Sequence, residues 1–154
     1  MAASTPAFER VVRAVDSATR TYSSVHRGTG WLSRVTSAHY EAAREEVARF
    51  VGAREGDEVV FTRNTTDSVN LLARSLPPRT SVVVFASEHH ASLLPWRPGD
   101  TVRLPVPGSV RDAEVLLEDA LRSLPAGTPR RPRQALVVLT AASNVTGELW
   151  PVER

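Results

Sequence analysis

The chain has 154 residues, 42% of them hydrophobic, so it is long enough to bury a core of its own. Its formal net charge is +2, and all 19 basic residues are arginines, spread among 17 acidic residues rather than gathered in one patch. This pattern argues against a nucleic-acid partner, and the absence of cysteine excludes disulfides, thiolate zinc sites and a thiol nucleophile within these residues.

No segment approaches the roughly 18 consecutive apolar residues that a membrane span requires. The first ten residues, MAASTPAFER, carry no apolar stretch of the length found in signal peptides. The sequence therefore predicts a soluble cytoplasmic protein without a membrane partner.

The first third of the chain predicts two helices. Thr5 and Pro6 suit a helix start, because proline is tolerated in the first turn, and apolar residues then recur at helical spacing up to Tyr22. Two glycines interrupt this pattern between 23 and 33 and predict a loop. A second helix is expected over roughly 36–50, with Gly52 as its stop.

The remainder of the chain alternates predicted strands and helices. Short apolar runs, several rich in β-branched residues, predict strands at 58–62, 81–86, 101–106 and 134–140. Helical spacing predicts helices at 65–76 and 109–124, the second with a capping signal at its start. Such alternation is typical of an α/β fold in which helices cover both faces of a mainly parallel sheet.

Polar side chains follow three of the predicted strands. Thr65 and Thr66 come soon after the first, His89 follows the second, and Asn144 follows the last. Ligands of open α/β sheets bind outside the carboxyl ends of the strands. If the strands are parallel, these side chains face one edge, and the sequence predicts a ligand site there.

Taken singly, two of these motifs leave alternatives open. The free amides and hydroxyls around Thr65 and Thr66 could bind a phosphate at a helix N-terminus, but plain N-capping also explains the motif. Asn144 could donate to a ligand oxygen, or it could belong to an ordinary turn.

The stretch Ser87-Glu88-His89-His90 admits three functions. Metal binding is disfavoured, because adjacent residues seldom converge on one ion and no second ligand pair is evident, so no metal site is predicted. His89 could act as a general base, or its imidazole could lie flat against a planar aromatic ligand. His90 is assigned no role.

Together these segments resemble a known family. NTTDSVNLLA, SEHHASLLPW and SNVTGELWPVE occur in the order and approximate spacing of class V aminotransferases, a group that includes cysteine desulfurases and selenocysteine lyases. AASTPAFERV and VHRGTGWLSRVTSAHYEAAREEVARFVGA resemble earlier parts of the same family. The resemblance implies a partial fold-type I pyridoxal-phosphate fold, with 1–52 as an N-terminal helical segment and 53–154 as the first part of the large α/β domain.

The resemblance also implies roles for particular residues. Thr65 and Thr66 would cradle the cofactor phosphate, His89 would stack on the pyridine ring, and Asn144 would bond the ring's phenolic oxygen. It further implies pyridoxal 5'-phosphate as cofactor, an amino acid as substrate, and a homodimer with active sites near the subunit interface.

One departure from the family concerns the chemistry itself. In the family, a lysine forms a Schiff base with the cofactor and an aspartate pairs with its ring nitrogen, both beyond the segment that SNVTG resembles. This chain contains no lysine. We therefore expect an N-terminal portion of a larger enzyme, truncated before the catalytic lysine, without catalytic residues of its own, inactive alone and weak or lacking in cofactor binding. Transamination, desulfuration and epimerisation all stay open.

Two other readings stay open. The chain could be a non-catalytic remnant that binds the cofactor weakly or serves as an interaction piece. It could also be a different nucleotide or phosphate binder on a doubly wound sheet, although no Gly-x-Gly-x-x-Gly fingerprint supports this reading.

Overall fold

The computed structural model describes residues 5–127, 134–143 and 145–152. The chain divides into two compact units, Met1–Phe61 and Thr62–Arg154, which are taken here in turn. Within the described ranges, no helix combines the length and apolar character that a membrane crossing requires. The family domains expected at 1–52 and 53–154 stay a prediction.

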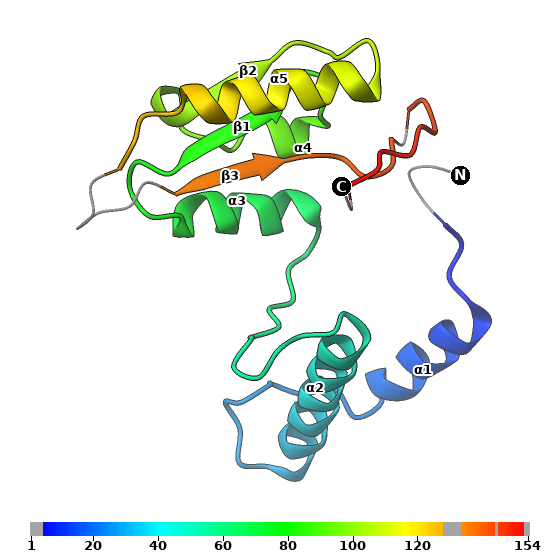
Figure 1. The fold of residues 1–154 in the computed structure, drawn as a ribbon. Helices are drawn as coiled ribbons and strands as arrows, with labels where there is room; N and C mark the ends of the chain where they lie inside the picture. Colours follow the sequence, from blue (N-terminus) through cyan, green and yellow to red (C-terminus); the bar gives the residue numbers. More distant parts are fainter. Residues whose placement is uncertain (1–4, 128–133, 144, 153–154) are drawn as a thin grey trace. The chain divides into compact units, whose positions relative to one another are not determined.

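The first unit contains two helices, α1 (Glu9–Thr19) and α2 (Trp31–Phe50) (Figure 1). The helix α2 begins before the predicted residue 36, and its first polar residue, Ser33, makes a contact within the unit. Ser33 is buried and its hydroxyl donates to the carbonyl of Ser24, so the preceding loop is fastened to the first turn. The helix α2 ends at Phe50, and Gly52, the predicted stop, follows the C-cap residue with a φ of 66°, which favours glycine.

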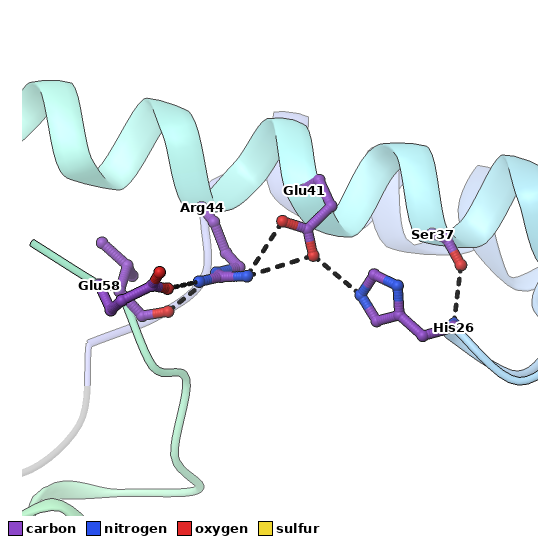
Figure 2. Close-up of polar contacts among 6 residues, drawn as sticks. His26, Ser37, Glu41, Arg44 and Glu58 are labelled. Atoms are coloured by element: carbon purple, nitrogen blue, oxygen red, sulfur yellow. Dashed lines mark hydrogen bonds and ion pairs between the residues drawn. The ribbon is translucent and has the colours of Figure 1, made fainter. Parts of the chain in front are cut away.

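Arg44 is the centre of a polar cluster on α2 (Figure 2). Its Nε donates to the carbonyl oxygen of Val59 at 2.9 Å, and its two terminal nitrogens bond Glu41, at 3.0 Å, and Glu58. The pKa of Arg44 is raised above its ordinary value, mainly by the negative charge of Glu41. Hydrogen bonds to Glu41 and Glu58 raise it further. One guanidinium therefore fastens the 58–59 segment to the helix.

The Glu41 carboxylate also holds the loop that precedes α2. His26 Nε2 lies 2.8 Å from Glu41 Oε1, and the His26 backbone N–H donates to Ser37 Oγ at 2.9 Å (Figure 2). These two contacts fix His26 in a left-handed backbone conformation, with φ of 57°, which is uncommon for a residue other than glycine.

The strand predicted at 58–62 is wrong. In the described part of the chain this segment has no strand partner, and a strand needs a neighbour for its amides and carbonyls. Arg44 takes the Val59 carbonyl instead, and the ring of Phe61 packs edge-on against Tyr40, with centroids 5.4 Å apart. The apolar run thus docks on α2 rather than joining a sheet.

The second unit is built on a three-stranded parallel sheet of order β2-β1-β3, as the sequence predicted for its core (Figure 1). Its strands are β1 (Ser81–Phe85), β2 (Thr101–Leu104) and β3 (Ala135–Val138). All of β1 is buried, because it lies between the other two strands and is covered on both faces. This explains its continuous apolar run.

Helices cover the two faces of β1, which alternate along the strand. Val83 and Phe85 belong to a core that includes Ala113 and Ala120 of α5 (Val110–Ser123). On the opposite face, Val82 adjoins α3 (Thr65–Ser75) and the buried Trp96. Two short elements, α4 (His90–Leu93) and η1 (Pro98–Asp100), connect β1 to β2.

Side-chain caps begin both long helices of this unit. Asn64 Oδ1 accepts from the amide of Asp67 at 2.9 Å at the start of α3. Ser109 Oγ accepts from the amide of Asp112 at 3.1 Å at the start of α5, which confirms the predicted capping signal. The helix starts are therefore fixed locally.

We expect Val83→Ala to lower the free energy of unfolding of the second unit by about 2–3 kcal/mol, since Val83 is fully buried and the change removes methyl groups and leaves a cavity. Val115→Ala, on the exposed side of α5, is the matched control and should shift the value by less than about 0.5 kcal/mol. Urea unfolding of both variants measures this, and equal effects would contradict the central place of β1.

We expect Arg44→Lys to increase amide hydrogen exchange in residues 58–61, because an ammonium cannot reproduce three directed guanidinium contacts at once. Arg49→Lys is the control, since Arg49 lies on the same helix and makes only an exposed pair with Glu46. Exchange followed by mass spectrometry should separate the two variants. Unchanged exchange at 58–61 in Arg44→Lys would show that the segment is held by packing alone.

Candidate functional site

One end of the second unit carries the polar residues that the sequence singled out. Because the strands are parallel, the carboxyl ends of β1 and β3 meet at this end, and the N-terminus of α3 lies there too, since α3 runs antiparallel to β1 (Figure 1). A cavity of about 380 Å³ opens at the strand ends. This volume is within the roughly 300–1,000 Å³ of small-molecule sites.

Apolar side chains form much of the cavity wall, and polar side chains complete it. The apolar ones include Phe85, Val106, Leu139 and Trp150. The polar ones include His89, His90, Ser143 and Thr146. A largely apolar surface with several polar groups suits a ligand with a flat ring and polar substituents.

His89 is held by the first turn of α4. It is the N-cap residue of this short helix, and its Nδ1 accepts from the amide of Ala91 at 3.1 Å. In the neutral ring this contact assigns the proton to Nε2. The imidazole is thus fixed at one edge while it lines the cavity, which is the arrangement that the predicted ring contact needs.

The loop that follows β3 forms another part of the wall. It folds back on itself: the Ser143 amide donates to the Glu148 carbonyl at 2.9 Å, and the Trp150 amide donates to Ala141 at 2.8 Å. Gly147 makes the turn with φ of 75°. Asn144 lies outside the described residues, so its predicted contact stays a prediction, although Ser143 and Val145 on either side of it line the cavity with His89.

The structure gives Glu88 a part that the sequence reasoning missed. Its Oε1 accepts from the Thr140 amide at 2.8 Å and its Oε2 accepts from the Thr140 hydroxyl. Both oxygens are occupied, and no group of three or more metal-ligating side chains occurs among the described residues. An acidic residue three positions after a buried strand was the available signal, since a buried carboxylate must find donors.

Thr65 and Thr66 occupy the first turn of α3 and are exposed; they do not line the cavity. Asn64 accepts the amides of Asp67 and Ser68 through its side chain and carbonyl. In the described part of the chain, the amides of Thr65 and Thr66 have no acceptor. Free amides at a helix N-terminus favour an anion.

Arg63 forms an ion pair with Asp67, which lies in the first turn of α3. Its Nε donates to Asp67 Oδ2 at 2.6 Å, and this hydrogen bond lowers the pKa of Asp67. The carboxylate that would oppose an incoming anion is therefore already paired. The structure thus brings His89 and the neighbours of Asn144 to one cavity, and leaves Thr65 and Thr66 at the same end of the unit but outside it.

Comparison with known proteins decides the family. Residues 1–154 match the family described as Aminotransferase class-V. The chain belongs to the class V aminotransferase family. Enzymes of this family depend on pyridoxal phosphate and act on amino acids, and the small parallel sheet with its helices is part of their fold-type I architecture.

Relatives of this family member are cysteine desulfurases by name. A probable cysteine desulfurase of Aeropyrum pernix is 40% identical, over 99% of this chain and 38% of the relative. One of Halalkalibacterium halodurans is 33% identical, over 93% and 36%. The apo structure of cysteine desulfurase from Thermococcus onnurineus NA1 superposes with a TM-score of 0.62 and 33% identity, over 75% of this chain and 32% of that one. The family member described here spans about a third of the length of these curated relatives.

We expect Arg63→Gln to raise the pKa of Asp67 towards its ordinary value, because the hydrogen bond and charge that stabilise the carboxylate are removed. In the unchanged protein the pKa is depressed, so the support that the pair gives to the α3 start is present above the unfolded pKa and lost as pH falls through the folded pKa. Carboxyl-carbon NMR titration of Asp67 in both proteins measures the difference. Coinciding titration curves would show that the pair is absent in solution.

Proposed function

We propose that this chain supplies the first part of the pyridoxal-phosphate pocket of a cysteine-desulfurase-like enzyme that acts on an amino acid. The observation that carries the proposal is the cavity at the carboxyl end of the parallel sheet, which His89 lines together with Ser143, Val145 and Thr146. The cysteine desulfurase names of the relatives support the narrower assignment within the family.

The residues present fit this cofactor in three respects. The cavity wall is largely apolar around a fixed imidazole, which suits a flat pyridine ring. Two free amides and two hydroxyls, of Thr65 and Thr66, suit a phosphate at the start of α3. Two neighbouring acids are paired, Asp67 with Arg63 and Glu88 with Thr140.

Each side chain has a separate task in this arrangement. Thr65 and Thr66 bind the phosphate, His89 supports the ring with its π-face, and Asn144 donates to the phenolic oxygen. Phe85 and Trp150 keep water from the ring's apolar edge. The bound cofactor supplies an electron sink for bonds at the amino-acid α-carbon.

The sequence lacks a lysine, so the 154 residues have no side-chain amine that could bond the cofactor. We propose that they hold the cofactor without a covalent bond and do not turn over amino acids alone. In an active enzyme, the amine that bonds the cofactor has to come from residues other than these. We further propose a cytoplasmic location, in line with the absence of a signal-peptide pattern in these residues.

A second candidate is a non-catalytic interaction piece, favoured by the exposed apolar side chains of α1. Val11, Val12 and Val15 are each about half exposed, and Phe8 is 79% exposed. A contiguous apolar strip of this kind is typical of an interface. It also supports the proposal of a homodimer, in which a second copy covers the strip.

The test uses pyridoxine 5'-phosphate, whose alcohol cannot condense with an amine, so that only the pocket is measured. We expect weak binding by calorimetry and no borohydride-trapped side-chain adduct with pyridoxal phosphate. His89→Ala should weaken the affinity roughly two- to tenfold through loss of the ring contact. His39→Ala, an exposed histidine of α2, should change nothing.

A phosphate-free arm completes the test. Pyridoxine should bind more weakly than pyridoxine 5'-phosphate, and Thr66→Ala should reduce this difference. Equal affinities for the two compounds would remove the start of α3 from the site. No binding of either compound to the unchanged chain would favour the interaction piece.

A further inference from the structure

Glu88 is a buried carboxylate that none of the proposed cofactor contacts uses. Its side chain is enclosed, with the residue only 7% exposed, and it meets Thr140, which lies 52 residues further along the chain. Glu88 follows β1 and Thr140 follows β3. One side chain therefore joins the segments that leave two neighbouring strands.

This contact begins where the strand pairing ends. The ladder between β1 and β3 runs from Ser81 with Ala135 to Val84 with Val138. Among the described residues beyond Val138, the ladder with β1 does not continue, and the bonds from Thr140 to Glu88 are the next hydrogen bonds between the two segments. The amide and the hydroxyl of Thr140 both donate to the carboxylate, and hydrogen bonds to a charged acceptor are the stronger kind.

The two joined segments carry the two parts of the cavity wall. His89 comes directly after Glu88 and is fixed by the Ala91 amide. Thr140 leads into the folded-back loop, described at residues 141–143 and 145–150, whose Ser143 and Thr146 line the same cavity. The Glu88–Thr140 contact thus links these parts at their base through hydrogen bonds, while the ring of Trp150 packs near that of Phe85, with centroids 6.3 Å apart.

We propose that Glu88 is a positioning residue that clamps Thr140 and so holds the loop residues 141–143 and 145–150 at a set place relative to His89, with the cavity formed before its ligand arrives. The proposal rests on the proposed function in that the ligand is taken to be pyridoxal phosphate. Preorganisation of this kind raises affinity, because the loop does not have to be ordered on binding. Glu88 and Thr140 also line the cavity, and both carboxylate oxygens of Glu88 accept from Thr140.

Two nearly isosteric substitutions separate the clamp from a general effect on stability. Thr140→Val removes the hydroxyl donor and keeps the amide bond, whereas Thr140→Ser keeps both donors. We expect Thr140→Val to speed hydrogen exchange of the Ser143, Gly147 and Trp150 amides about tenfold, from the loss of a hydrogen bond to a charged group. Thr140→Ser should leave them unchanged, and the amides of β1 should exchange at the same rate in both.

Glu88→Gln provides a third, conservative variant. Its amide oxygen can still accept from the Thr140 amide, and the Thr140 hydroxyl can accept from its NH₂ group. We expect loop exchange between that of the unchanged chain and that of Thr140→Val. A ligand arm then follows: pyridoxine 5'-phosphate should bind Thr140→Val about five- to tenfold more weakly than Thr140→Ser, if the lost order is restored on binding.

The arms decide different questions. Equal loop exchange in Thr140→Val and Thr140→Ser would overturn the clamp, as would a uniform rise of exchange that includes β1. Equal affinity of the two variants for pyridoxine 5'-phosphate, with different loop exchange, would overturn the link between the clamp and the cavity. Absence of binding in the unchanged chain would instead overturn the proposed function, while the exchange arm still decides on the clamp.

Discussion

The parallel pairing of β1 with a strand on each side is the constraint on which the second unit depends. It removes the whole of β1 from solvent and obliges both faces to be covered, one by α5 and the other by α3 and Trp96. It also sends the ends of β1 and β3 to one edge. The helix that precedes β1 has to run the opposite way, so its free amides arrive at that edge as well. The parallel pairing of β1 therefore determines both the packing of the second unit and the geometry of its site.

At this edge, local contacts determine which polar groups stay free. Asn64 accepts two amides of α3, the Ala91 amide occupies His89 Nδ1, and Thr140 saturates Glu88. In the part of the chain that the structure describes, the imidazole face of His89 lines the cavity and the first two amides of α3 have no acceptor. One flat surface and a few anion donors suit few classes of ligand. They suit a phosphorylated aromatic cofactor better than a metal or a nucleic acid.

The parts of this structure that depend on near neighbours could be predicted from sequence. Asn64 and Ser109 cap their helices through residues three positions away, and the apolar run of β1 reports its own burial. Contacts between residues far apart in the sequence could not be predicted. The apolar run at 58–62 has the pattern of a strand, but pairing requires a neighbouring strand that the local pattern does not specify. In the structure, Arg44 binds the Val59 carbonyl instead. The Glu88–Thr140 contact spans 52 residues and was hidden for the same reason.

The sheet is also unequally covered. Whereas β1 is wholly enclosed, side chains of β3 alternate between exposed and half-buried, and in the described part of the chain β3 pairs on one side only. Its outer row of backbone groups is a template that any extended peptide can add to, irrespective of that peptide's side chains. At high concentration, this row is a place where main-chain hydrogen bonds between copies of the chain would form.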